Sequence, residues 1–261
     1  MKRTKIKAEL SDFPKEFHPL ITNTDIYDSS CSPEARVVFI DKDTGYFLKK
    51  APKGTLRREY VMSDYFSSLS LTKKPLSYLS LESDWLLTPK VIGEDATHSA
   101  YLSDGKRLAE TLGEILRALH ELSATDCPIN NRLTTYLDLA KKNHREDNFD
   151  TGFFLCDKPR TKDEIYKRAL EGFPCLENNC LIHGDFCLPN VIFNDWKLSG
   201  YIDLGNGGMG DRHIDILWGI WTLRFNLGTN KYTDRFMDAY GRELIEPEML
   251  RMVAAMEMIG A

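Results

Sequence analysis

The feature that most constrains the fold is a pair of short hydrophobic segments with acidic and amide side chains at their ends. The segments are Val191–Phe193 and Leu198–Ile202, and we expect them to form two short strands joined as a hairpin. The run His183-Gly-Asp185 and the residue Asn190 precede the hairpin, and Asp203 follows it. Because the two ends of a hairpin lie together, Asp203 is expected to return to the place that Asn190 and Asp185 occupy.

Two carboxylates and one amide on consecutive turns are typical of a phosphotransfer site that uses magnesium and a nucleotide. Gly184 allows a tight turn that lets Asp185 face an acceptor hydroxyl as a general base. The amide oxygen of Asn190 is a hard ligand suited to Mg²⁺, and the carboxylate of Asp203 would bridge the metal and the phosphates. A single Asp or Asn in a loop is usually a turn former. The combination of Asp, Asn at +5 and Asp at +18 is far more specific.

The composition is that of a globular protein long enough for one large domain or two lobes. The chain has 261 residues, 42% of them hydrophobic and 28% charged, and a net charge of -5. The mild acidity argues against a nucleic-acid partner, and no window is apolar enough for a membrane span. We therefore expect a cytoplasmic protein with free thiols. Zinc binding by Cys180, His183 and Cys187 is disfavoured because a fourth ligand at suitable spacing is missing.

The first third of the chain is rich in strands. Arg36–Asp41 and Gly45–Lys50 are predicted to form a hairpin, Leu56–Leu69 has helical spacing, and Trp85–Thr88 is strand-like. Pro89 and Gly93 then interrupt the pattern. We predict an N-terminal nucleotide-binding lobe over residues 1–90 and a catalytic and substrate-binding lobe over residues 91–261.

The remainder of the chain is mainly helical. Lys106–Leu122 has one apolar face, and His120 near its end is interpreted as a packed or capping residue. Asp138–Asp150 is polar and acid-rich, the helical pattern resumes over Thr161–Leu170, and a long apolar helix is expected to end at Gly228. Strands followed by helices indicate an α+β fold with a small lobe on a larger, mostly helical one.

Lys49 is the candidate cation for the nucleotide phosphates. Side chains alternate along a strand, so Phe47 and Lys49 share one face, where an aromatic ring would stack on a purine and the amine would reach the phosphates. Glu59 on the following helix is the natural ion-pair partner of Lys49. The segment Ser29–Pro33, which includes Ser32, can cover the phosphates with hydroxyl and N–H groups, although it lacks the glycines of a P-loop.

Together these residues resemble the aminoglycoside phosphotransferases, specifically the 3′-hydroxyl kinases of the bacterial resistance type. The resemblance extends along nearly the whole chain, with order, spacing and flanks in agreement. It is carried by Ser32-Pro33, Phe47-Leu-Lys49, Arg58-Glu59, Ser123–Pro128, His183–Asp185 through Asn190, Gly200–Gly205, Asp211 with Asp215-Ile216, and Arg224 with Leu227-Gly228.

The resemblance implies a two-lobed protein-kinase-like fold and an enzyme that uses ATP and Mg²⁺. By this resemblance Asp185 is the catalytic base, Asn190 and Asp203 are the magnesium ligands, and Lys49 with Glu59 anchors the phosphates. The remaining implied roles are adenine stacking by Phe47, phosphate contact by the Ser32 loop, a hinge donor at Val91, and hydrogen bonds from the catalytic-loop backbone to Asp215. Val91 is the better hinge donor because Pro89 has no N–H.

The implied acceptor is a polycation, so its pocket should be acidic. Asp147 and Asp150 resemble the acidic substrate loop of the family, and Glu257 is similar to its C-terminal acidic contact. The chain departs from the family pattern at Asn206, where an arginine is common, and in the ending Met258–Ala261. We expect the substrate range to depend on these positions.

Two alternatives remain open at this point. One is a kinase of the same fold that acts on another small alcohol, such as a choline-like or amino-sugar metabolite, which an aromatic cage in the acceptor pocket would favour. The other is a nucleotide-binding module without turnover, against which the intact residues Lys49, Asp185, Asn190 and Asp203 argue. The choice between ATP and GTP is also open, and a monomer is a plausible state.

Overall fold

The computed structural model describes residues 3–149 and 161–259, and the chain divides into two compact units. The first comprises Met1–Asp95 together with Ile192–Gly205, and the second comprises Ala96–Val191 and Asn206–Ala261. The predicted division into a nucleotide-binding lobe up to residue 90 and a catalytic lobe after it stays a prediction. In the structure the chain passes between the units after Asp95, and the hairpin that ends near Asp203 packs with the first unit.

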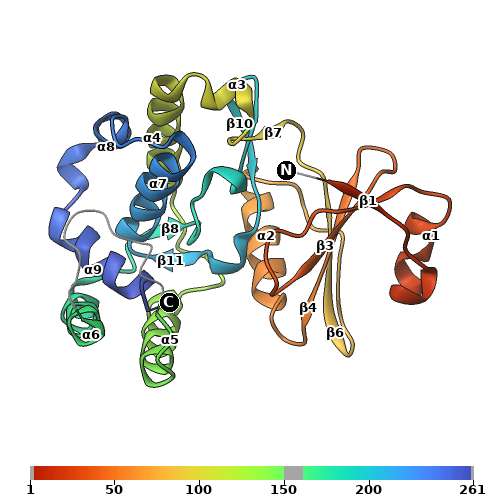
Figure 1. Ribbon diagram of the computed structural model, residues 1–261, viewed down its shortest axis with the longest axis horizontal. Coiled ribbons are helices and arrows are strands. Elements are labelled where there is room, and N and C mark those ends of the chain that lie inside the picture. Colours follow the sequence, from red (N-terminus) through yellow and green to blue (C-terminus); the bar gives the residue numbers. More distant parts are fainter. Residues whose placement is uncertain (1–2, 150–160, 260–261) are drawn as a thin grey trace. The chain divides into compact units, whose positions relative to one another are not determined.

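The first unit is built on an antiparallel sheet of order β1-β2-β3-β4-β6-β5, drawn in red to yellow in Figure 1. Its strands are β1 (Thr4–Ile6), β2 (Ile26–Asp28), β3 (Arg36–Ile40), β4 (Tyr46–Pro52), β5 (Ser77–Ser80) and β6 (Ser83–Pro89). The predicted hairpin is β3-β4, with Phe47 paired to Phe39 and Lys49 paired to Val37. The predicted helix is α2 (Arg57–Ser68).

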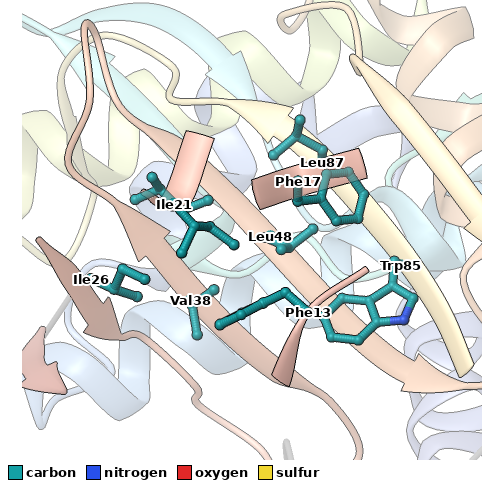
Figure 2. Packing of buried hydrophobic residues seen from close by; sticks show 9 residues of the cluster. Phe13, Phe17, Ile21, Ile26, Val38, Leu48, Trp85 and Leu87 are labelled. Carbon is teal, nitrogen blue, oxygen red and sulfur yellow. The ribbon is translucent and has the colours of Figure 1, made fainter. Parts of the chain in front are cut away.

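A hydrophobic core covers one face of this sheet. The short helices η1 (Leu10–Asp12), η2 (Lys15–Phe17) and α1 (His18–Ile21) belong to the segment that supplies Phe13, Phe17 and Ile21 to this core. Figure 2 shows these side chains over Val38, Leu48, Trp85 and Leu87. Leu48 is buried among them, and because strand side chains alternate, Phe47 and Lys49 belong to the opposite face. The core therefore fixes the face that carries the candidate nucleotide residues.

The hairpin predicted from the central motif is present as β9 (Val191–Asn194) and β10 (Lys197–Tyr201), in a small sheet of order β10-β9-β7 with β7 at Glu94–Asp95. Asp195 and Trp196 form its tight turn with positive φ angles. The short helix η5 (Leu204–Asn206) follows β10 and leads from the first unit into the second.

The second unit is helical with one two-stranded sheet. Its helices are α3 (Ser99–Leu102), α4 (Gly105–His120), α5 (Arg132–Arg145), α6 (Lys162–Gly172), α7 (Arg212–Leu227), α8 (Thr233–Tyr240) and α9 (Pro247–Glu257), with η3 (Phe173–Cys175), η4 (Leu188–Asn190) and η6 (Arg242–Leu244). Strand β8 (Cys180–Ile182) pairs antiparallel with β11 (Gly208–Gly210). Figure 1 shows these helices in yellow-green to blue.

Local sequence explains where the main helices begin and end. Asp104 caps α4 by accepting a hydrogen bond from the N–H of Arg107, and Asp211 caps α7 by accepting one from the N–H of His213. Gly228 ends α7 in the left-handed conformation, as predicted. The apolar face of α4 is buried, and Gly113 on it lies so close to α8 that a Cβ would be 2.5 Å from the carbonyl oxygen of Phe236.

The structure confirms the predicted α+β class. Helix α5 was not predicted, because the sequence in this region shows polar and acidic residues without a clear apolar periodicity. Its buried face is narrow and includes the polar residues Arg132 and Asn143. No helix of the described chain has the length and apolarity needed to span a bilayer.

Candidate functional site

The nucleotide-side residues lie in the first unit around the amine of Lys49. Its Nζ is 2.8 Å from Oε2 of Glu59 on α2 and 2.8 Å from Oδ1 of Asp203. Glu59 is buried, whereas the side chain of Asp203 is half exposed. Asp203 has φ 59, a left-handed conformation that Asp adopts more readily than most residues. The structure thus brings three of the predicted residues together, with one cation between two carboxylates.

The charges of this triad are not balanced. Burial raises the pKa of Glu59 to about 7, and the charge of Asp203 adds to the rise, while Lys49 opposes it. Burial disfavours the charge on Lys49, but the attraction of the two carboxylates outweighs it and raises the pKa of the amine above its usual range. Lys49 is therefore a permanent cation at neutral pH. With both carboxylates ionised the triad has a net negative charge, which favours a further cation beside Asp203.

The predicted base-stacking residue Phe47 is half-buried on the same face as Lys49. Its ring centroid is 5.1 Å from that of Phe39, and the guanidinium carbon of Arg3 lies 3.7 Å from the Phe39 centroid. Ser32 is exposed in the β2-β3 connection and hydrogen-bonds the carboxylate of Glu34, which contributes to lowering the pKa of that group. Val91 is buried just after β6. Their roles toward a nucleotide stay predictions.

Asp185 and Asn190, the predicted base and metal ligand, lie in the second unit. Asn190 donates its side-chain N–H groups to the carbonyl oxygen of Asp185, at 3.0 Å, and to Oδ2 of Asp185, at 2.9 Å. Its amide nitrogen is thereby turned toward Asp185, and its amide oxygen is the remaining ligand atom. The predicted link between Asp185 and Asn190 is thus a direct contact. Asp203 belongs to the other unit, and its pairing with Asn190 as a metal ligand stays a prediction.

A buried aspartate binds the backbone of the His-Gly-Asp turn. Asp215 on α7 accepts hydrogen bonds from the N–H groups of His183 and Gly184, both at 2.7 Å. His120 lies 3.2 Å from the same carboxylate, and its other ring nitrogen is 2.8 Å from the hydroxyl of Tyr240. The structure confirms that Asp215 binds the backbone of this turn and that His120 is a packed residue.

A backbone carbonyl borders the turn on another side. Gly184 has φ 80, and a Cβ there would lie 2.0 Å from the carbonyl oxygen of Asn206. Only glycine fits this position, because both the conformation and the space exclude a side chain.

We expect Gly184→Ala to lower both the melting temperature and the phosphotransfer rate, because the new methyl group must displace Asn206. A left-handed non-glycine residue alone costs about 1 kcal/mol, and the backbone clash adds to it. Gly228→Ala is the matched control, since Gly228 has φ 63 but nothing within 4 Å of an added Cβ. Thermal unfolding of both variants measures the difference, and equal melting temperatures would contradict the expected clash.

Of the residues predicted to bind the acceptor, Asp147 and Glu257 differ in their exposure to solvent. Asp147 is exposed after α5, has φ 56 and forms an ion pair with Lys162. Asp150 lies outside the described residues. Glu257 at the end of α9 is only 4% exposed, and it accepts a hydrogen bond of 2.5 Å from the hydroxyl of Tyr136 on α5. The contact of Tyr136 with Glu257 joins residues 121 positions apart and had no signal in the sequence.

Glu257 lies close enough to Asp185 for the charge of one to affect the other. Burial raises its pKa to about 8, and the charge of Asp185 adds to the rise, while Tyr136, Arg132 and Trp218 favour the ionised form. At neutral pH the protonated form of Glu257 is therefore well populated.

We expect the free energy of unfolding of the parent protein to fall from about pH 4.5 to pH 8 relative to that of Glu257→Gln. Through this window the folded state retains the Glu257 proton, whereas the unfolded chain releases it near its usual pKa of 4.5. The folded state then binds more protons, so its stability declines as the pH rises. One pKa unit corresponds to about 1.4 kcal/mol. Denaturant unfolding at pH 5 and pH 8.5 measures the effect, and identical pH slopes for the two proteins would show that Glu257 titrates normally.

The described cysteines, Cys31, Cys127, Cys175, Cys180 and Cys187, carry free thiols. Burial raises the pKa of Cys180 and Cys187 above the usual range, which disfavours the thiolate. Within the described ranges no three His, Cys, Asp or Glu side chains are grouped to hold a metal ion.

Comparison with known proteins gives consistent matches. The model of the phosphotransferase enzyme family matches residues 33–253. A probable aminoglycoside 3′-phosphotransferase of Lactococcus lactis is 44% identical over 256 residues, which is 98% of each chain. An aminoglycoside 3′-phosphotransferase of Niallia circulans is 30% identical, with 92% of this chain and 94% of that protein covered.

Solved structures with the same fold are more distant in sequence. The crystal structure of a type VIII aminoglycoside-3′-phosphotransferase matches with a TM-score of 0.76 at 20% identity, over 95% of both chains. An aminoglycoside phosphotransferase of Streptomyces rimosus in complex with ADP and streptomycin matches with a TM-score of 0.72 at 21% identity, over 87% of this chain and 90% of that one. These likenesses confirm the predicted kinase-like fold.

Proposed function

The chain belongs to the phosphotransferase enzyme family, among the aminoglycoside 3′-phosphotransferases, and we propose that it transfers the γ-phosphate of ATP to the 3′-hydroxyl of an aminoglycoside. Such a transfer would make the host resistant to the antibiotic, and we place the enzyme in the cytoplasm, where ATP is available. The observation that carries the phosphotransfer chemistry is the Lys49 amine, fixed at 2.8 Å from both Glu59 and Asp203.

The donor set fits a magnesium nucleotide. The half-exposed Asp203 carboxylate offers oxygen ligands in a triad whose net charge favours a further cation, and the amide oxygen of Asn190 is the same kind of hard ligand. When bound, Mg²⁺ supplies positive charge to the phosphate oxygens. Asn190 and Asp203 would hold it.

The residues of the chain divide the work of the transfer. Glu59 orients the Lys49 amine so that its charge meets the phosphates, and Phe47 offers its ring to the base. Asp185 accepts the proton of the acceptor hydroxyl, while Asn190 fixes its Oδ2 and Asp215 fixes the turn beneath it. The chemistry needs little else from the protein, because phosphoryl transfer depends mainly on position and charge.

Binding of a polycationic acceptor is favoured by negative charge in its pocket. We propose Asp147, Asp150 and Glu257 for this role, because the relatives are aminoglycoside 3′-phosphotransferases and aminoglycosides are polycations. Glu257 is buried beside Tyr136 and its protonated form is well populated at neutral pH, so it would contribute negative charge only in its ionised form.

The test is a phosphorylation assay with the purified protein, ATP, Mg²⁺ and kanamycin or neomycin, with the product followed by mass spectrometry. We expect one added phosphate on kanamycin and none on tobramycin, which lacks the 3′-hydroxyl. Phosphorylation of tobramycin would refute the 3′ assignment. If the protein hydrolyses ATP but phosphorylates no aminoglycoside and accepts choline, the acceptor class is wrong. If it does not bind ATP, the kinase assignment itself is wrong.

A further inference from the structure

Arg132 is a permanent cation that is buried at the N-terminus of a helix, where its charge is energetically unfavourable. It is the first residue of α5 and only 3% exposed. Guanidinium groups stay charged in proteins, burial of a charge is costly, and a cation at a helix N-terminus opposes the helix dipole. Among the described residues no carboxylate lies within ion-pair distance of Arg132. A residue that violates local preferences in this way is more often found at functional sites than elsewhere.

The contacts of Arg132 point to the catalytic turn. Its Nε donates a hydrogen bond of 3.0 Å to the carbonyl oxygen of Asn206. That carbonyl oxygen is the atom that excludes a side chain at Gly184. The turn that presents Asp185 is thus bordered by two fixed groups, the Asp215 carboxylate that binds its N–H groups and the Asn206 carbonyl that Arg132 holds.

The residue that carries this carbonyl also lies close to Asp203 along the chain. Asn206 is three residues after Asp203 and ends η5. A contact that fixes Asn206 therefore limits the freedom of the segment that follows Asp203.

The charge of Arg132 also acts on the neighbourhood of Asp185. Its guanidinium carbon is 4.9 Å from the ring centroid of Tyr136, one helical turn later, and the Tyr136 hydroxyl binds Glu257. Arg132 favours the ionised form of Glu257, and Asp185 opposes it. The charges of Arg132 and of the partly buried Asp185, the proposed catalytic base, thus both act on the buried Glu257.

We propose that Arg132 is a positioning residue for phosphoryl transfer, which holds the Asn206 carbonyl against Gly184 and so fixes the direction of Asp185. The proposal rests on the proposed function and adds a residue to it. A group misplaced by about 1 Å can reduce the rate of a reaction about 100-fold. We therefore expect loss of Arg132 to lower kcat and to leave the binding of ATP and of kanamycin nearly unchanged.

The test compares Arg132→Met and Arg132→Lys with the parent protein. Arg132→Met removes a charge whose burial is costly but also removes the donor to the Asn206 carbonyl, so the two effects oppose each other and the change in melting temperature should be small. We expect its kcat to fall about 100-fold, with each KM within threefold of the parent value. Arg132→Lys retains the charge but not the planar fork, and its kcat should lie between the two. Arg235→Met, which removes a surface ion pair with Glu110, is the control and should match the parent.

A kcat of Arg132→Met within threefold of the parent would overturn the proposal, as would equal losses in kcat and in both affinities. If Arg132→Met does not fold, Arg132→Ala with added methylguanidinium replaces it, and absence of rescue overturns the proposal. ATP hydrolysis without acceptor is measured in parallel. A parent protein that hydrolyses ATP but phosphorylates no aminoglycoside refutes the proposed function, while the hydrolysis rate of Arg132→Met still decides the role of Arg132. A parent protein that does neither overturns both.

Discussion

Asp185→Asn is expected to reduce kcat for aminoglycoside phosphorylation about 1,000-fold, which corresponds to roughly 4 kcal/mol in the transition state. Asn has the size of Asp and can still accept the hydrogen bond from Asn190, but it cannot take a proton from the acceptor hydroxyl. The affinity for ATP should stay the same, because Lys49, Glu59 and Asp203 are unchanged. Steady-state kinetics with kanamycin and a separate nucleotide-binding measurement test both expectations.

Asp215→Asn is the informative comparison, because Asp215 and Asp185 serve the same turn in different ways. Both oxygens of Asp215 accept backbone N–H groups, so an Asn amide nitrogen would face one of them without an acceptor. Such a mismatch in a buried site costs about 1–3 kcal/mol. Asp215→Asn should therefore lose both stability and activity, whereas Asp185→Asn should lose activity alone. A kcat of Asp185→Asn within tenfold of the parent value would exclude Asp185 as the base.

The sequence was sufficient for elements whose pattern is local. The apolar periodicity of Lys106–Leu122 predicted α4, and the terminal glycine at position 228 predicted the end of α7. The spacing of Asp185, Asn190 and Asp203 indicated phosphotransfer, which agrees with the family of the chain, while the roles of these three residues stay predictions.

The sequence was insufficient where a contact joins distant segments or where the buried face is polar. Helix α5 was missed because Arg132 and Asn143 interrupt its apolar face. The bond of Arg132 to Asn206 joins positions 74 apart, and nothing in either local sequence indicates it. The strands β1, β2 and β5 were also missed, because three or four residues are too few to show an alternating pattern.

Asp203, one of the two carboxylates beside Lys49, is the second residue whose substitution we expect to lower kcat strongly. Asp203→Asn should lower kcat about 100- to 1,000-fold, the range found when one electrostatic stabiliser of a transition state is removed. The substitution should be tolerated by the backbone, because Asn adopts the left-handed conformation of φ 59 as readily as Asp does. The Asp203 side chain is half exposed and Glu59 still pairs with Lys49, so the loss of stability should be small.

The dependence on Mg²⁺ separates a metal ligand from a residue that only holds Lys49. If Asp203 binds the metal, Asp203→Asn should require a higher Mg²⁺ concentration for half-maximal rate, whereas Glu59→Gln should lower the rate at an unchanged Mg²⁺ requirement. Asp195→Asn is the matched control, since Asp195 is also left-handed, with φ 50, and lies in the preceding hairpin turn. An unchanged Mg²⁺ requirement in Asp203→Asn would limit Asp203 to the electrostatics of Lys49 and would leave Asn190 to act with a different second ligand.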